Sequence, residues 1–106
     1  MKSLPIVLTF FILVACSTEI EVSPAQVQDA IKKSDGFNSY SDVFVTETTK
    51  LVKNGKCTLN ELAEQGGWMK STLNYSAEPV YFTYCGGMHR SNRVYLNVIT
   101  QKVFTD

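Results

Sequence analysis

The chain has 106 residues, of which 44% are hydrophobic and 19% are charged, and its ten basic side chains balance ten acidic ones. A chain of this length forms one small domain, because it is too short for a two-domain enzyme and too apolar for a disordered tail. The balanced charge lacks the basic excess that is typical of nucleic-acid-binding proteins. We therefore expect one small domain that has no nucleic-acid partner.

The N-terminus carries one lysine, Lys2, followed by an uncharged and mostly apolar run at residues 4–15. A helix needs about 20 apolar residues to cross the hydrocarbon core of a membrane, and this run is shorter. A core helix of this composition would be hydrophobic on every side, and a small domain cannot cover all its faces. The run therefore predicts a secretory signal peptide at residues 1–15.

The end of this run carries a four-residue motif: Leu13, Val14, Ala15 and Cys16. The motif resembles the lipobox of bacterial lipoproteins, which implies cleavage before Cys16 and acylation of its sulfur. Two or more acyl chains, at about 0.8 kcal/mol for each buried methylene, anchor a protein stably. Ser17 stands where an aspartate would favour the inner membrane, so the resemblance implies the periplasmic face of the outer membrane. The alternative is an ordinary cleavage site at residues 15–17, which would release a soluble protein beginning at Thr18.

The two remaining cysteines, Cys57 and Cys85, form an even pair in an oxidising compartment, where a disulfide is the default. The bond would close a loop of 28 residues, for which the chain-entropy model gives about 3.5 kcal/mol of stabilisation. The chain contains no C-x-x-C spacing, which disfavours a redox role. We therefore predict a structural disulfide.

The mature chain begins with a lipidated N-terminus and short tether, residues 16–22, and a single domain follows at residues 23–106. Ser23 and Gln26 predict a capping box at the start of a short amphipathic helix that ends before Gly36. Together these features place one helix directly after the tether.

Two further elements are predicted before residue 68. β-branched and other side chains alternate at residues 42–53, which predicts a long strand ending at the turn of residues 54–55. Thr58 and Glu61 form a second capping box, and Gly66 ends the helix of about two turns that it predicts. Cys57 precedes this helix directly, so the disulfide would pin the helix to the strand that carries Cys85.

The last forty residues have the pattern of a β-meander, with turns at Pro79 and at residues 86–87. The predicted strands are residues 68–75, 80–85, 93–99 and 102–104. The whole order predicts an α+β domain, a small antiparallel sheet of about four strands with one or two short helices on one face. Residues 94–104 are also similar to the closing hairpin of PepSY-type periplasmic domains, with Gln101 where glycine is usual.

Catalytic and metal-binding patterns are sparse. His89 is the only histidine, and neither a G-x-S-x-G nor an H-E-x-x-H motif occurs. Glu61 and Glu64 lie three positions apart on the short predicted helix, where a solvated face explains them better than paired catalytic carboxylates. Met88 and His89 suit a soft metal such as Cu(I), although a surface turn is favoured. We expect that the protein is not an enzyme and binds no cofactor. The alternative function is copper handling by a lipoprotein that uses Met88 and His89.

Aromatic residues are dense in the predicted sheet, and their polar tips suit contact with a partner. Alternation places Phe82 and Tyr84 on one side of their strand, and Tyr81 and Cys85 on the other. A small domain cannot bury both sides, so we predict a partner-binding surface, although cross-strand packing alone is the competing explanation. The predicted partner-binding residues are Trp68, Tyr75, Tyr81, Tyr84 and Tyr95. The leading hypothesis is a lipid-anchored, non-catalytic module that binds an envelope protein or glycan.

Overall fold

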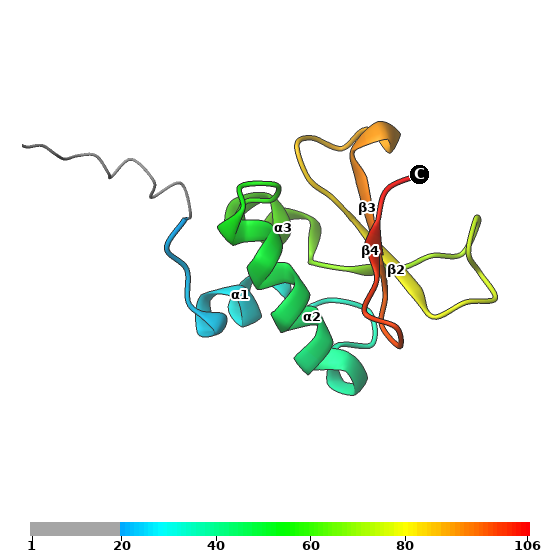
Figure 1. The fold of residues 1–106 in the computed structure, drawn as a ribbon, viewed down its shortest axis with the longest axis horizontal. Helices are drawn as coiled ribbons and strands as arrows, with labels where there is room; N and C mark the ends of the chain where they lie inside the picture. The colour runs from blue at the N-terminus through cyan, green and yellow to red at the C-terminus, as the bar shows by residue number, and fades with distance from the viewer. Residues whose placement is uncertain (1–19) are drawn as a thin grey trace, which may run out of the picture.

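The structure, a computed structural model, describes residues 20–106 (Figure 1). The predicted signal peptide at residues 1–15 and the predicted lipidation site Cys16 lie outside these residues. The helices are α1 (Pro24–Ile31), α2 (Phe37–Lys53) and α3 (Leu59–Gln65). The strands are β1 (Met69–Lys70), β2 (Val80–Tyr84), β3 (Arg93–Asn97) and β4 (Val103–Phe104).

The four strands form one antiparallel sheet in the order β1-β2-β3-β4, and the helices cover one of its faces (Figure 1). This α+β arrangement confirms the predicted fold class, with one more helix than expected. Within residues 20–106, no helix is both long and apolar enough to span a membrane.

Both predicted capping boxes are present. The backbone N–H of Gln26 donates to Ser23 Oγ at 3.3 Å, and the N–H of Ser23 donates to Gln26 Oε1 at 2.9 Å. The same reciprocal pair joins Thr58 and Glu61 at the start of α3, which ends at Gly66 with a φ of 85°. These bonds satisfy N–H groups that the first turn of a helix leaves without partners, so the local sequence fixes both helix starts.

The strand predicted at residues 42–53 is wrong, because this segment is the C-terminal part of α2. Phe44, Thr48 and Leu51 repeat at helical spacing and are buried on one side of α2. α2 packs against α1, and Phe44 stacks against the Trp68 ring with centroids 6.1 Å apart. Burial of this face outweighs the strand preference of the β-branched residues.

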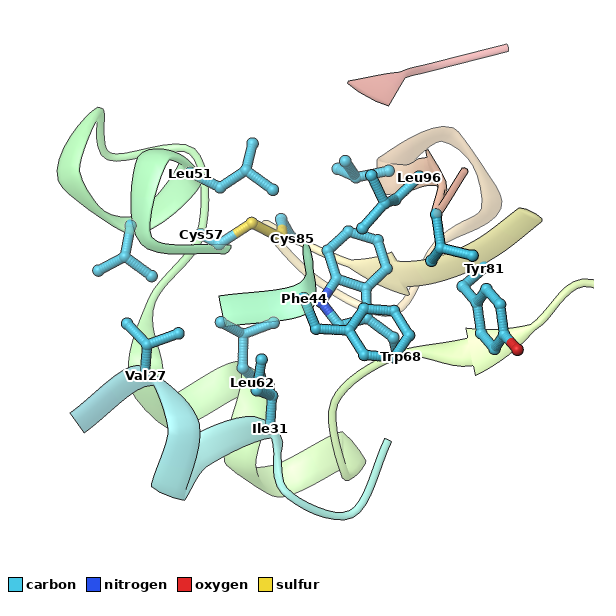
Figure 2. Packing of buried hydrophobic residues seen from close by; sticks show 13 residues of the cluster. Val27, Ile31, Phe44, Leu51, Cys57, Leu62, Trp68, Tyr81, Cys85 and Leu96 are labelled. Carbon is cyan, nitrogen blue, oxygen red and sulfur yellow. A yellow bond between two sulfur atoms is a disulfide. The ribbon is translucent and has the colours of Figure 1, made fainter. Parts of the chain in front are cut away.

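The core lies between the helices and the sheet, and the disulfide crosses it (Figure 2). Cys57 and Cys85 are bonded, as predicted, with their Cα atoms 4.8 Å apart and side chains 0% and 3% exposed. The bond joins the start of α3 to the residue after β2. It therefore ties the helical layer to the end of a central strand of the sheet.

The predicted strand at residues 68–75 shortens to β1, two residues long, because a loop replaces its second half. A side chain of α3 continues the pairing on this side of β2. The N–H of Tyr84 donates to Gln65 Oε1 at 2.9 Å, and Gln65 Nε2 donates to the Tyr84 carbonyl at 2.7 Å. A primary amide carries the same donor and acceptor as a peptide unit, so Gln65 takes the place of a strand residue.

The β3–β4 turn contains Gln101 with a φ of 64°, the only positive φ at a non-glycine position in residues 20–106. This conformation is the one for which glycine is the usual residue. The side-chain oxygen of Asn97 stabilises the turn by accepting the N–H groups of Ile99 and Thr100 at 2.9 and 3.0 Å.

Candidate functional site

Two of the predicted partner-binding residues belong to the core. Trp68 is 0% exposed and Tyr81 is 8% exposed, and both rings contact Phe44. The indole Nε1 of Trp68 donates to Thr48 Oγ1 at 2.8 Å, which satisfies its buried polar atom. Neither side chain is available for a partner of the folded domain, so the prediction for these two residues does not fit their burial.

The other aromatic side chains gather on the sheet face away from the helices, which we call the outer face. Register pairing places one residue from each strand in a row across it: Met69, Phe82, Tyr95 and Phe104. Tyr84 and Arg93 form the next pair, on the same side. The outer face therefore carries a band of aromatic rings with one cation.

One end of the outer face is closed by Tyr75, from the loop between β1 and β2. Its ring lies 5.1 Å from that of Tyr95 and 5.4 Å from that of Phe104. Tyr95 also stacks on Phe104 at 5.2 Å and is 0% exposed. Tyr75 and Tyr84 remain half-buried. Of the predicted partner-binding residues, these two present surface on the outer face, while Tyr95 is buried among the rings of Tyr75, Phe82 and Phe104.

Arg93 lies at one end of the outer face, at the start of β3. Its guanidinium carbon lies 4.7 Å from the centre of the Phe82 ring and 5.5 Å from that of Tyr84. Arg93 Nε donates to the Tyr84 hydroxyl at 3.0 Å, and Nη1 donates to the Tyr95 hydroxyl at 3.5 Å. The hydrogen bonds that Arg93 donates, first to Tyr95 and then to Tyr84, raise the pKa of Arg93. Contacts with rings and hydroxyls thus fix the orientation of a permanent cation.

Arg93 forms no salt bridge with any residue between 20 and 106, where two ion pairs occur, Lys32–Asp29 and Lys50–Glu47. Beside it lies Leu73, whose side chain is 81% exposed. A shallow hollow of about 50 Å³ is lined by Ser71, Thr72, Leu73, Phe82 and Arg93. The outer face therefore offers a cation and an aliphatic side chain together.

Sequence reasoning missed both Arg93 and Leu73. The signal for Arg93 was available, because it alternates with Tyr95 and faces Tyr84 once the two predicted strands are paired in register. No such signal existed for Leu73, since its exposure depends on the loop that replaces the second half of the predicted first strand.

The Met88 and His89 loop is exposed, with Met88 at 68%. Between residues 20 and 106, no group of three or more His, Cys, Asp or Glu side chains is placed to hold a metal ion. Asn92 Nδ2 steadies the loop by donating to the Gly86 carbonyl at 2.9 Å. The loop is thus built by local hydrogen bonds around its glycines.

Glu61, one of the two carboxylates on α3, is held by backbone groups. Its Oε1 accepts the N–H of Gly86 at 2.7 Å, and its Oε2 accepts the N–H of Thr58 at 2.8 Å. Burial acts to raise its pKa, but the hydrogen bonds from Gly86 and Thr58 outweigh burial and lower it. Glu61 therefore has a capping role that also fastens α3 to the loop after β2.

A second hollow, of about 260 Å³, lies where the chain enters the domain. Ile20 and Val22 line it together with Val52, Cys57 and Leu59. The N–H of Ile20 donates to the Lys53 carbonyl at 3.0 Å, so the entering chain forms one of its walls. Glu21, Thr58 and Asn60 complete its lining, and Thr58 is already engaged in the capping box of α3.

The outer face is therefore the best candidate site in residues 20–106, because it alone combines an oriented cation with exposed apolar surface. Its described side chains are an oriented guanidinium, aromatic rings and an exposed aliphatic group, and arginine and aromatic residues are enriched at binding interfaces. Comparison of the chain with models of protein families, with curated proteins and with solved structures finds no match.

Proposed function

We propose that the protein is a small lipid-anchored lipoprotein of the cell envelope, whose domain binds another envelope macromolecule without turning it over. The observation that supports binding most directly is Arg93, a guanidinium that aromatic rings and hydroxyls orient and that no acidic side chain in residues 20–106 neutralises. Arginine and tyrosine next to each other are typical of the residues that dominate binding energy at interfaces.

The proposed address comes from the sequence motif that ends at Cys16, on the periplasmic face of the outer membrane. The disulfide between Cys57 and Cys85 supports an oxidising compartment, where such bonds form and persist. Since the mature chain from residue 16 carries nine basic and ten acidic side chains, its charge supplies little attraction to anionic lipid, and the acyl chains would provide the attachment.

The anchor predicts a clear labelling result. In a bacterial host fed an alkyne analogue of palmitate, the full chain is expected to take up the label, and the Cys16→Ser variant is expected to lose it and leave the membrane fraction. Serine has no sulfur to acylate. As a control, the double variant Cys57→Ser, Cys85→Ser keeps Cys16 and should keep the label. If the native chain is unlabelled and its mass matches a protein that begins at Thr18, the signal peptide is removed at an ordinary cleavage site and no lipid is attached.

The binding role predicts a position-specific cross-link in living cells. A photo-reactive amino acid at Leu73 is expected to give several-fold more adducts with envelope components than the same residue at Lys56, an exposed position on the helical side. Adducts at residue 73 should disappear when Arg93→Gln is added, because the cation holds the partner. Equal adducts at both positions, or adducts that ignore Arg93, would argue against the outer face as the site.

A further inference from the structure

We infer that the surface around Ile20, which we call the entry end, lies against the lipid bilayer, and that the outer face points away from the bilayer into the aqueous compartment. The partner of the outer face is then a macromolecule, or the part of one, that lies outside the anchoring membrane. This inference rests on the proposed lipid anchor at Cys16 and names the side from which the partner is reached.

The chain joins the domain on the helical layer. The N–H of Ile20 donates to the carbonyl of Lys53, the last residue of α2, at 3.0 Å. Ile20 also lines the hollow of about 260 Å³ together with Leu59, the first residue of α3. The chain is therefore fixed to the helices from Ile20 onward, and the part that can act as a tether shortens from residues 16–22 to residues 16–19.

The entry end and the outer face lie on opposite sides of the domain. In Figure 1 the described chain begins beside α1 and α3 at one end, and the loop between β1 and β2 extends to the other end, beyond the sheet. That loop carries Leu73, which lines the hollow of the outer face with Arg93. The helical layer and the sheet thus separate Ile20 from the outer face.

The tether is short compared with the domain. Four residues span at most about 14 Å when they are fully extended. A domain of the size of residues 20–106 has a radius of gyration of about 12 Å, which corresponds to a sphere of about 15 Å radius. A sphere held by a tether shorter than its radius can touch a plane only with the half that contains the attachment point. The outer face belongs to the other half, so it cannot reach the bilayer that holds Cys16.

The side chains of the entry end are compatible with a lipid–water interface. Ile20 is 47% exposed, and Glu21 and Asn60, which line the same hollow, are exposed and polar. Lys53 contributes a charge opposite to that of Glu21. Because both signs of charge are present, headgroups neither strongly attract nor strongly repel this surface, and the short tether sets the orientation of the domain.

This orientation assigns the exposed leucine of the outer face. Leu73 is 81% exposed and lies beside Arg93. An apolar side chain next to a cation suits either a membrane interface or a protein partner. Since the β1–β2 loop lies in the half of the domain that the anchoring bilayer cannot touch, Leu73 is available to a partner that approaches through water.

Quenching by a lipid-bound nitroxide tests this orientation on the full, acylated chain. The chain is added to preformed vesicles of phosphatidylethanolamine and phosphatidylglycerol, in which a fraction of the headgroups carries a nitroxide. A fluorophore is attached through a non-natural amino acid at Asn60 or at Leu73, both exposed, which leaves all three cysteines unchanged. Quenching at residue 60 should be several-fold stronger than at residue 73, because a nitroxide quenches only at short range.

A lengthened tether is the matched control. Inserting about twenty glycine and serine residues after Thr18 adds a flexible segment with an r.m.s. length of about 25 Å, which exceeds the radius of the domain. The difference between residues 60 and 73 should then largely disappear, because every side of the domain can reach the headgroups. The Cys16→Ser variant gives the quenching of the unattached protein, and residue 73 of the native chain should not exceed it.

Equal quenching at residues 60 and 73 of the membrane-bound native chain would overturn the inference, and so would a difference that the longer tether leaves unchanged. In either case the chain is still attached to the vesicles, so the proposed anchor stands. If the native chain itself fails to bind the vesicles, the proposed anchor is wrong, and the orientation inferred from it is wrong too.

Discussion

Replacing Trp68 with alanine is expected to lower the free energy of unfolding by about 4 kcal/mol, because it removes the largest fully buried side chain in residues 20–106. The ring stacks on Phe44 at 6.1 Å, and its Nε1 bonds Thr48 Oγ1 at 2.8 Å. Alanine would leave a cavity between α2 and the sheet and a buried hydroxyl without its donor. The loss is measured by urea denaturation followed by circular dichroism. Tryptophan fluorescence is unsuitable because the variant lacks the only tryptophan in the chain.

Two variants make the Trp68 result specific. Trp68→Phe keeps much of the ring volume and should cost less, about 1–2 kcal/mol, chiefly for the hydrogen bond to Thr48. Leu73→Ala removes an apolar side chain that is 81% exposed and should change stability by less than about 0.5 kcal/mol. A loss for Trp68→Ala as small as that for Leu73→Ala would contradict the packing of the core described above.

Loss of the disulfide is expected to lower the free energy of unfolding by about 3.5 kcal/mol, the chain-entropy value for a loop of 28 residues. The double variant Cys57→Ala, Cys85→Ala is suitable because both side chains are buried and alanine leaves no unpaired thiol. The bond lies beside the pairing of Gln65 with Tyr84, so its removal should loosen α3 against β2. Denaturation curves of the oxidised chain, the reduced chain and the double variant provide the measurement.

The reduced chain and the double variant should agree within about 1 kcal/mol, the ordinary scale of a single substitution. Thiol labelling must show that reduction is complete. If the fully reduced chain keeps the denaturation midpoint of the oxidised chain, the disulfide contributes little to stability and the hydrophobic core alone stabilises the domain.

The parts of the fold that could be predicted from the sequence are those with local signals. Short-range patterns predicted three helix ends: the capping boxes at Ser23 and Thr58 and the stop at Gly66. The disulfide was predicted from the number of cysteines, since two remain once Cys16 is set aside. The prediction of a strand at residues 42–53 was wrong because β-branched residues favour strands. The helix that forms there depends on burial against α1 and Trp68. Phe44, Thr48 and Leu51 do repeat at helical spacing, but the strand preference of the β-branched residues competes with that signal, and only tertiary burial decides between them.

The same distinction explains the partner-binding residues. Alternation correctly separates Tyr81 from Tyr84, but it cannot say which side the helices cover. Because residues 42–53 were predicted to be a strand, the predicted fold lacked α2, the helix whose Phe44 packs on Tyr81 and Trp68. The position of Arg93 next to Tyr84 follows from the register of β2 on β3, which depends on residues nine positions apart meeting across the sheet.

Gln65 also affects how the sheet can pair with another copy of the protein at high concentration. Its amide occupies the backbone groups of Tyr84 that a foreign strand would need on that side of β2, and β1 and β4 are each two residues long. In the part of the chain that the structure describes, the sheet therefore presents little free edge to a neighbouring copy. We therefore expect edge-to-edge pairing between the sheets of neighbouring copies to be disfavoured at high protein concentration.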